Sequence, residues 1–307
     1  MKILVTGGAG FIASNLTDAL IEEGHSVFVL DNLSSGFEKN INPKAVFVKA
    51  DIRDNSLSKL FEKEKFDIVN HHAAQMDVRR SVADPAFDAD TNIIGTLNLL
   101  QNSVKFKIKK FMFASTGGAI YGEQEYFPAD EKHPTAPLSP YGISKLAVEK
   151  YLFFYKVQYD LKYTILRYAN IYGPRQNPHG EAGVVAIFSK KLLNGEQPVI
   201  NGNGKQTRDY TFVKDVVKAN LLTLNDKSSD IYNVGTGKET DVNELFNKMN
   251  KIIGKGQIEK HGQAMPGEQL RSVITSEKLK QKFGWSPSTL LEEGLKNTVE
   301  FFKVNLT

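Results

Sequence analysis

The sequence predicts an α/β protein with a doubly wound parallel sheet and a smaller α/β lobe toward the C-terminus. Short apolar runs rich in β-branched residues alternate with segments of helical periodicity. Several of these runs are apolar on both faces, which is typical of strands buried in a parallel sheet. A glycine-rich turn joins the first run to the first helical segment. Together these observations favour repeated strand–helix units with helices on both sides of one sheet.

Most of the expected strands lie in the first half of the chain. They are Lys2–Thr6, Ser26–Leu30, Ala45–Lys49, Asp67–His71, Lys110–Ala114, Lys162–Arg167 and the later Asp230–Val234. Helices are expected at Ile12–Glu23, Thr91–Ser103, Tyr141–Tyr159, Val184–Asn194, Val213–Asn225, Val242–Ile253 and Leu290–Phe302. Beyond Arg167 the pattern loosens, so residues 1–168 and a returning segment at about 211–234 are assigned to the sheet domain. Residues 169–210 and 235–307 are assigned to the smaller lobe.

Composition excludes several classes of function. The 307-residue chain has a net charge of +4 spread along its length and no cysteine, so disulfides and thiolate chemistry are excluded. The lysine-rich run 105–110 is better explained as a solvated helix end than as a nucleic-acid site. The N-terminus has the pattern of a strand, not of a signal peptide, and no apolar run approaches membrane-spanning length. We expect a cytoplasmic protein without a nucleic-acid or membrane partner.

The turn after the first strand has the pattern of a dinucleotide-binding loop. Gly7 and Gly10 let the backbone turn tightly and approach a pyrophosphate at the start of the next helix. Asp31 ends the second strand 24 residues after Gly7, close to the spacing expected for a carboxylate on the adenosine ribose diol. A carboxylate there repels a 2′-phosphate, which favours NAD over NADP. The alternative is that Asp31 is only a turn residue.

The segment 139–145 combines a phenol and an ammonium at the start of a helix. Ser139 is a good N-cap and Pro140 suits the first helical position, so Tyr141 and Lys145 share one helical face. A nearby cation favours the phenolate, so Lys145 is expected to lower the pKa of Tyr141 and make it a general base. The alternative for such a pair alone is an exposed amphipathic helix face.

Further motifs along the chain carry a family resemblance. They are TGGAGFI at 6–12, DNLSSG at 31–36, HAA at 72–74, NIIGT at 92–96, YG at 121–122, SPYGISK at 139–145, LRYANIYGPR at 166–175, RDY at 208–210 with Val213 and Asp215, NVGTG at 233–237 and GW at 284–285. In this order they resemble the extended short-chain dehydrogenase/reductase family, and within it the UDP-sugar 4-epimerases.

The resemblance implies a dinucleotide (Rossmann) fold, bound NAD and a UDP-sugar substrate. NAD takes hydride from sugar C4, Tyr141 accepts the 4-hydroxyl proton, and the 4-keto sugar turns over before hydride returns. The implied cofactor contacts are Gly7, Gly10, Phe11, Ile12, Asp31, Asn32, Leu33, Ser34, Ser35, Gly36, Asp51, Ile52, His72, Ala73, Ala74, Gln75, Asn92, Ala114, Tyr141, Lys145 and Tyr168. The implied substrate contacts are Thr116, Tyr141, Asn170, Val184, Val185, Arg208, Arg271 and Ser272.

The chain departs from the family pattern at positions that matter for chemistry. Family epimerases usually carry Ser or Thr four residues before the tyrosine of YG, where this chain has Gly117. The catalytic hydroxyl is therefore assigned to Thr116, with Ser115 as the alternative. Met265 replaces a common phosphate-binding arginine, for which Arg271 can substitute.

Ser272 aligns with the family's gate beside the sugar C2 substituent, where a small residue leaves room for an N-acetyl group. The resemblance thus suggests UDP-N-acetylglucosamine and UDP-N-acetylgalactosamine as substrates, with UDP-glucose and UDP-galactose also possible. A plain loop serine is the alternative.

Two rival functions remain open at this point. One is a nucleotide-sugar 4,6-dehydratase or decarboxylase of the same family, and the other is a catalytically silent NAD-binding regulator. Family members pair as homodimers through two helices, here the segments 91–103 and 141–159. No metal is expected, because the adjacent His71 and His72 on one strand face opposite ways.

Overall fold

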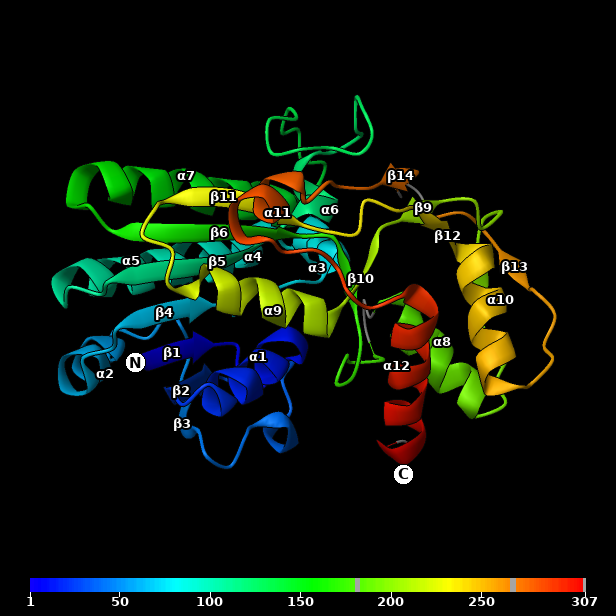
Figure 1. Cartoon of the computed structure of the whole chain (residues 1–307), viewed down its shortest axis with the longest axis horizontal. Coiled ribbons are helices and arrows are strands. Elements are labelled where there is room, and N and C mark those ends of the chain that lie inside the picture. The colour runs from blue at the N-terminus through cyan, green and yellow to red at the C-terminus, as the bar shows by residue number, and fades with distance from the viewer. Residues whose placement is uncertain (180–182, 266–268, 306–307) are drawn as a thin grey trace.

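The computed structural model describes residues 1–179, 183–265 and 269–305, and it shows two lobes side by side (Figure 1). The larger lobe is built on a parallel sheet with the strand order β11-β6-β5-β4-β1-β2-β3. Its strands are β1 (Lys2–Thr6), β2 (Ser26–Asp31), β3 (Val46–Lys49), β4 (Ile68–His71), β5 (Lys110–Thr116), β6 (Lys162–Tyr168) and β11 (Asp230–Val234). The order reverses between β1 and β4, which places a crevice at the carboxyl ends of these strands.

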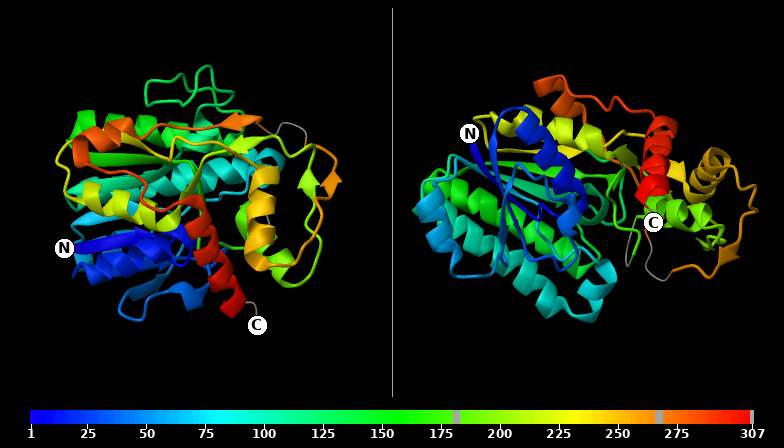
Figure 2. Two further views of the ribbon diagram at one scale, coloured as in Figure 1. Left: turned by 45° about the vertical axis from the view of Figure 1, so that its right-hand side comes forward. Right: turned by 90° about the horizontal axis from the view of Figure 1, so that it is seen from below.

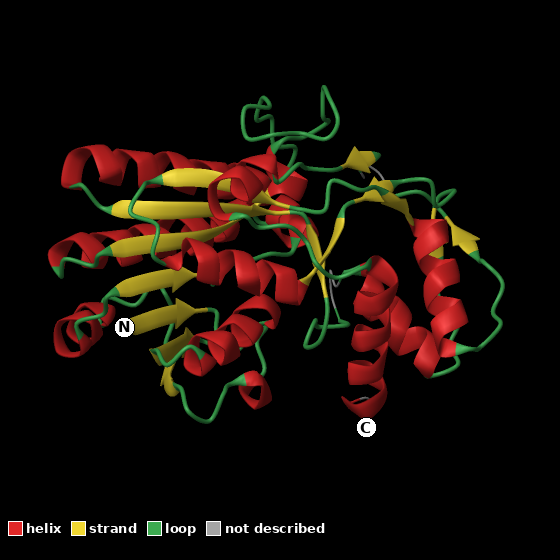
Figure 3. Cartoon of the chain, viewed as in Figure 1, coloured by secondary structure: helices red, strands yellow, loops and turns green. Residues whose placement is uncertain are grey.

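Helices cover both faces of the sheet, as Figure 2 shows from below and Figure 3 by colour. One face packs against α1 (Phe11–Glu22), α9 (Val213–Leu224) and α11 (Glu277–Phe283), and the other against α2 (Leu57–Glu64), α5 (Gly95–Lys105) and α7 (Pro140–Tyr159). Shorter turns are η1 (Glu38–Asn40), α3 (Val78–Ala83), α4 (Pro85–Ala89), the π-helical η2 (Asp90–Ile94) and α6 (Gly117–Ile120). Two apolar cores thus sandwich the sheet, and the expected doubly wound fold is confirmed.

The start of α7 follows directly from its sequence. The Ser139 hydroxyl accepts a hydrogen bond of 3.2 Å from the Gly142 N–H, and Pro140 occupies the first turn. Asp160 ends the helix in the left-handed conformation. Although α7 is long, no helix in the described part of the chain has both the length and the apolar character needed to cross a membrane.

The smaller lobe is assembled from segments on either side of α9 and β11. Its elements are β7 (Asn170–Tyr172), α8 (Val184–Leu193), β8 (Ile200–Asn201), β9 (Thr207–Arg208), β10 (Tyr210–Phe212), β12 (Thr240–Asp241), α10 (Val242–Ile253), β13 (His261–Gly262), β14 (Arg271–Ser272) and α12 (Leu291–Asn305). A core that includes Phe188, Phe246 and Leu295 joins its helices. After α10 and β14 the chain forms α11, which packs on the sheet of the larger lobe, and then α12, which lies in the smaller lobe (Figure 1).

The predicted elements differ from the observed ones mainly at their ends. The helix expected at Thr91–Ser103 is split, because its first part forms η2 and the regular helix begins at Gly95. The strands β5 and β6 extend to Thr116 and Tyr168, which brings both side chains to the carboxyl edge of the sheet.

Candidate active site

The glycine-rich loop after β1 lies against the loop after β4. Gly7 has a φ of 69°, and a Cβ atom there would lie 2.7 Å from the Ala73 nitrogen. The Thr6 carbonyl accepts a hydrogen bond of 3.2 Å from the His72 N–H, so the two loops are held together. Only glycine permits this approach at position 7, because any side chain would be both strained and in collision.

The first turn of α1 is suited to an anionic group. Its N-cap is Gly10, which provides no side-chain hydrogen bond, and the first turn contains no acidic residue. The backbone N–H groups of this turn and the helix dipole are what a pyrophosphate requires. A Cβ on Gly10 would already lie 3.0 Å from the Gly7 oxygen, so the loop keeps a bare backbone surface there. The residues therefore fit a dinucleotide.

Asp31 lies at the end of β2 and contacts the same loop. One carboxylate oxygen accepts a hydrogen bond of 3.0 Å from the Ala9 N–H, and the other accepts one of 2.8 Å from the Leu33 N–H. Burial raises the pKa of Asp31, while these two backbone bonds act in the opposite direction. Asp51, at the next strand end, accepts hydrogen bonds from Arg53 and Asn32. Asp31 thus fixes its own turn and also borders the cofactor loop, where its contact with the ribose stays a prediction.

Asn92 supports the loop after β4 through its side-chain amide. Its Oδ1 accepts a hydrogen bond of 2.9 Å from the Gln75 N–H, and its Nδ2 donates one of 2.9 Å to the Gln75 carbonyl. His72, in the same loop, lies 3.2 Å from the Tyr168 hydroxyl. Burial, together with the nearby Lys145, lowers the pKa of His72 to about 3, so this ring is neutral near pH 7. A direct cofactor contact by Asn92 stays a prediction.

Tyr141 and Lys145 lie on one face of α7, as expected. The Lys145 ammonium is 5.8 Å from the centre of the Tyr141 ring and donates a hydrogen bond of 2.8 Å to the Ala114 carbonyl at the end of β5. Burial lowers the pKa of Lys145 to about 8, although Asp88 and Glu149 favour the ammonium. The lysine is therefore largely charged at pH 7.

The expectation that Lys145 lowers the pKa of Tyr141 is wrong for the protein without bound groups. Burial raises the pKa of Tyr141 above its ordinary value, and the negative charge of Asp88 raises it further. The physical reason is that the phenolate loses hydration on burial, while the ammonium of Lys145 is directed to a backbone carbonyl. Tyr141 is consequently a neutral phenol near pH 7.

The structure distinguishes the two candidate hydroxyl groups. Ser115 donates a hydrogen bond of 2.6 Å to Glu149, whose carboxylate also forms an ion pair of 2.6 Å with Arg167. The neighbouring Thr116 lies at the last position of β5, where its Oγ1 accepts a hydrogen bond of 3.2 Å from the Ala119 N–H. A Cβ placed on Gly118 would lie 3.8 Å from the Thr116 Oγ1 and 3.5 Å from the Asn170 Oδ1. Thr116 and Asn170 therefore border the same space, which Gly118 leaves open.

Arg208 and Ser272 are brought together by the smaller lobe. They are partners in the parallel pair β9–β14, and the Asp209 N–H donates a hydrogen bond of 3.0 Å to the Ser272 carbonyl. Ser272 is only 3% exposed, so its small side chain is surrounded by other groups. Asp209 accepts hydrogen bonds from the N–H groups of Thr236 and Gly237, which fixes the strand that carries Arg208.

The other expected substrate contacts have partners within the protein. The Arg271 guanidinium makes two hydrogen bonds to Glu239, of 3.0 and 2.7 Å, and stacks 3.6 Å from the centre of the Phe127 ring. Val185 packs into the core of the smaller lobe, and Val184 packs against that core. The two valines can thus contact a substrate only through their backbone N–H groups at the start of α8. The substrate contacts of all three residues stay predictions.

Sequence reasoning missed the buried polar groups behind the site. Glu149, Ser144 and Asp88 are all less than 5% exposed and hold α7 against neighbouring elements. Glu149 could have been found, because it follows Lys145 by four residues on the same helical face. Asp88 gives a weaker signal, because Asn92 follows it by four residues but Gln75 and Ser144 lie 13 and 56 residues away.

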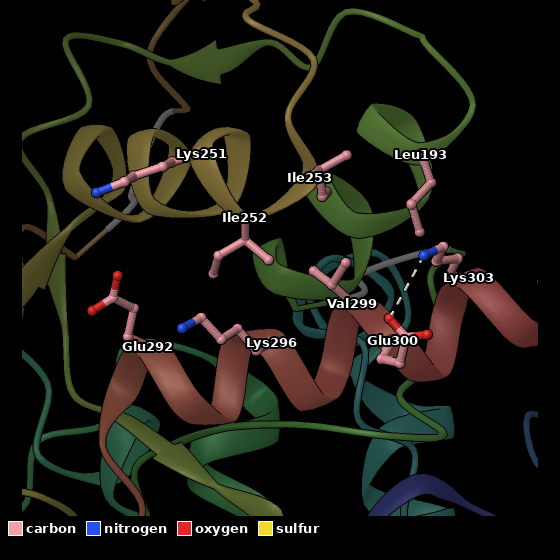
Figure 4. Close-up of a pocket in the computed structure, with 9 residues that line it drawn as sticks. All are labelled: Leu193, Lys251, Ile252, Ile253, Glu292, Lys296, Val299, Glu300 and Lys303. Atoms are coloured by element: carbon pink, nitrogen blue, oxygen red, sulfur yellow. Dashed lines mark ion pairs between the residues drawn. The ribbon is translucent and has the colours of Figure 1, made fainter.

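A cavity of about 590 Å³ lies between α8, α10 and α12, away from these residues (Figure 4). It is lined by Leu193, Lys251, Ile252, Ile253, Glu292, Lys296, Val299, Glu300 and Lys303, none of which belongs to the expected site. Among the described residues, no group of three or more acidic or histidine side chains is placed to hold a metal.

Comparison with known proteins places the chain in one family. The profile of the NAD dependent epimerase/dehydratase family matches residues 3–235. A putative UDP-glucose 4-epimerase from Methanocaldococcus jannaschii is 49% identical over 303 residues, covering 99% of both chains. The structure of UDP-glucose 4-epimerase from Thermotoga maritima with UDP-glucose is 50% identical with a TM-score of 0.98, covering 100% of both chains. That of UDP-N-acetylglucosamine 4-epimerase from Methanobrevibacter ruminantium, in complex with UDP-N-acetylmuramic acid, is 36% identical with a TM-score of 0.94, covering 100% of this chain and 99% of that one. These matches confirm the resemblance, and the chain belongs to the NAD dependent epimerase/dehydratase family.

Proposed function

We propose that the protein is a UDP-sugar 4-epimerase that uses bound NAD. The observation that carries this proposal is that Tyr141 and Lys145 share one face of α7 beside β5, the strand whose last residue is Thr116. Lys145 is bonded to the Ala114 carbonyl on that strand. The first turn of α7 packs on α6, where a Cβ on Gly142 would lie 2.7 Å from the Ala119 oxygen. Relatives that cover nearly the whole chain carry the same activity in their names.

The chemistry assigns one task to each group. When bound, NAD would supply a hydride acceptor and a positive charge. Tyr141 would accept the proton of the sugar 4-hydroxyl, with Thr116 hydrogen-bonded to the same oxygen. Lys145, which lies beside the Tyr141 ring, would bind the nicotinamide ribose. Arg208 binds the diphosphate, so that the hexose can turn over while the nucleotide stays bound.

Product analysis tests this proposal. Purified protein is incubated separately with UDP-glucose and UDP-N-acetylglucosamine, and the nucleotide sugars are resolved. A reversible mixture of 4-epimers supports it, whereas loss of water from the sugar would indicate a dehydratase. Loss of carbon dioxide from UDP-glucuronate, a substrate that carries a carboxylate, would indicate a decarboxylase. Gly117 and Gly118 stand where dehydratases carry acidic residues, which argues against elimination. Absence of any conversion with NAD bound would favour the silent regulator.

Thr116 is proposed as the hydroxyl that contacts the sugar, and Ser115 as a structural group. Thr116→Ala is expected to lower kcat by about 10²-fold, because the proton path loses its hydroxyl. Thr116→Ser should retain most of the rate. Ser115→Ala should instead lower the free energy of unfolding, since the Glu149 carboxylate loses a donor. Steady-state rates and denaturant unfolding of the three variants separate the two roles, and a larger rate loss in Ser115→Ala would reverse them.

Ser272 is proposed to admit an N-acetyl group at sugar C2. Its small side chain beside Arg208 supports this role, as does the relative named for UDP-N-acetylglucosamine. Ser272→Tyr is expected to lower kcat/KM for N-acetylated sugars at least about tenfold relative to UDP-glucose, because the added ring fills the space. UDP-glucose turnover by the same variant is the internal control for folding. Equal losses on both substrate classes would contradict the gate.

The outer face of α7 supports a homodimer. Ile143, Tyr151 and Phe154 are 53%, 39% and 49% exposed, and they follow one another at helical spacing. A surface hollow of about 410 Å³ is lined by Ala147, Lys150, Tyr151 and Phe154. Pairing with the same face of a second copy would cover this apolar stripe. Sedimentation of the purified protein tests the proposal.

A further inference from the structure

Asp88 is a buried carboxylate to which no lysine, arginine or histidine among the described residues is hydrogen-bonded. It lies in α4 and is 0% exposed. One oxygen accepts hydrogen bonds from the Gln75 Nε2 at 3.1 Å and the Asn92 Nδ2 at 3.0 Å, and the other accepts one of 2.7 Å from the Ser144 hydroxyl. All three donors are neutral. Since an isolated buried charge is costly, a positive charge close by is required to balance it.

The three donors belong to the segments that border the proposed site. Gln75 lies in the loop after β4, and Asn92 braces that loop from η2. Ser144 lies in α7 between Tyr141 and Lys145. Asp88 therefore connects the cofactor loop with the helix that carries the phenol and the ammonium.

The charges that face Tyr141 and Lys145 come from several elements. Asp88 approaches from α4, and Glu149 lies on α7 itself, where its charge is paired with Arg167 of β6. His71 at the end of β4 and His72 in the loop after it are neutral, because burial and the nearby Lys145 lower the pKa of both. Lys145 directly follows Ser144, whose hydroxyl is hydrogen-bonded to Asp88, and Asp88 and Glu149 are the charges that favour its ammonium form. Consistently, Asp88 acts to raise the pKa of both Lys145 and Tyr141.

We propose that Asp88 is a positioning residue for the epimerisation, which fixes α7 to the cofactor loop and supplies the negative charge that keeps Lys145 an ammonium. Its negative charge also opposes ionisation of Tyr141. This inference rests on the proposed roles of Tyr141 and Lys145, but its first test measures only the charge of a lysine.

The substitution Asp88→Asn removes the charge and keeps the shape. The asparagine oxygen can accept from Gln75 and Asn92, and its NH₂ group can donate to the Ser144 hydroxyl, which accepts as well as it donates. Ser144→Ala is the matched control, because it removes a hydrogen bond to Asp88 and leaves the charge.

The first measurement is an NMR titration of lysines labelled with carbon-13, with the Lys145 signal assigned by Lys145→Arg. In Asp88→Asn the apparent pKa of Lys145 is expected to fall by about one unit relative to the parent protein. Lys110 is an internal control, because burial also lowers its pKa to about 8 but Asp226 and Lys282, and not Asp88, are the charges that act on it. In Ser144→Ala the pKa values of Lys145 and Lys110 should both stay unchanged.

The second measurement is the pH dependence of kcat. The rate is expected to fall at alkaline pH as Lys145 loses its proton. Since removal of Asp88 lowers the pKa of Lys145, this alkaline limb of the Asp88→Asn profile should move about one unit toward acid. A Lys145 titration unchanged in Asp88→Asn, or one that moves together with Lys110, would overturn the proposal whether or not the protein is an epimerase. If the pKa of Lys145 shifted in Asp88→Asn but the pH dependence of kcat did not, the proposed effect of Asp88 on catalysis would be wrong.

Discussion

Replacement of Tyr141 by phenylalanine is expected to lower kcat by about 10³-fold, with NAD still bound. The phenol is the only ionisable group proposed to accept the 4-hydroxyl proton, and its loss leaves that proton without an acceptor. The ring itself is retained, so its packing beside Lys145 is preserved. Steady-state turnover of UDP-glucose and the amount of NAD per protein chain should be measured together.

Tyr151→Phe is the matched control for this variant, because Tyr151 lies on the same helix but is 39% exposed on its outer face. Its turnover should equal that of the parent protein. If Tyr141→Phe kept the parental rate, the proposed general base would be wrong. A loss of bound NAD in the same variant would assign Tyr141 to cofactor binding.

Replacement of Arg167 by methionine is expected to lower the free energy of unfolding by about 3–5 kcal/mol. The side chains of Arg167 and Glu149 are 4% and 2% exposed and form an ion pair of 2.6 Å. Removal of the guanidinium leaves Glu149 charged in a buried environment, where the Ser115 hydroxyl is the one hydrogen-bond donor that remains to it among the described residues. Denaturant unfolding at pH 7 gives the size of the loss.

Two further variants identify the cause of this loss. The double variant Glu149→Met and Arg167→Met should be more stable than Arg167→Met alone, because no unpaired charge remains. Lys205→Met breaks the exposed ion pair with Asp241 and should leave the free energy of unfolding nearly unchanged. If the double variant were the less stable of the two, packing and not charge would explain the effect.

The sequence predicted the elements whose pattern is local. The strands of the sheet were found because their apolar, β-branched runs are buried on both faces. The position of α7 was found because Ser139 and Pro140 mark its start. The helices α2 and α11 were missed, because each is short and buries only one or two apolar side chains. Features that depend on residues within one helix or one turn were thus predictable from the sequence.

The remaining errors concern properties that depend on distant segments. Lys145 and Tyr141 could be placed on one face from their spacing alone. The direction of the Tyr141 pKa could not be predicted, because it depends on burial and on Asp88. The role of Ser115 likewise depends on Glu149, which reaches β5 from α7. Contacts between residues on different elements do not follow a fixed spacing in the sequence, so they could not be predicted from it.

The strand β11 pairs with β6 after the chain has already built β9 and β10 of the other lobe. In consequence, division of the chain at one position does not separate the larger lobe, proposed to bind the coenzyme, from the smaller lobe, proposed to bind the sugar. A hybrid with a new sugar specificity would need several exchanged stretches, and truncation before residue 230 would expose the backbone edge of β6 to self-association. Sugar specificity in this architecture is therefore easier to change by point substitution than by exchange of chain segments.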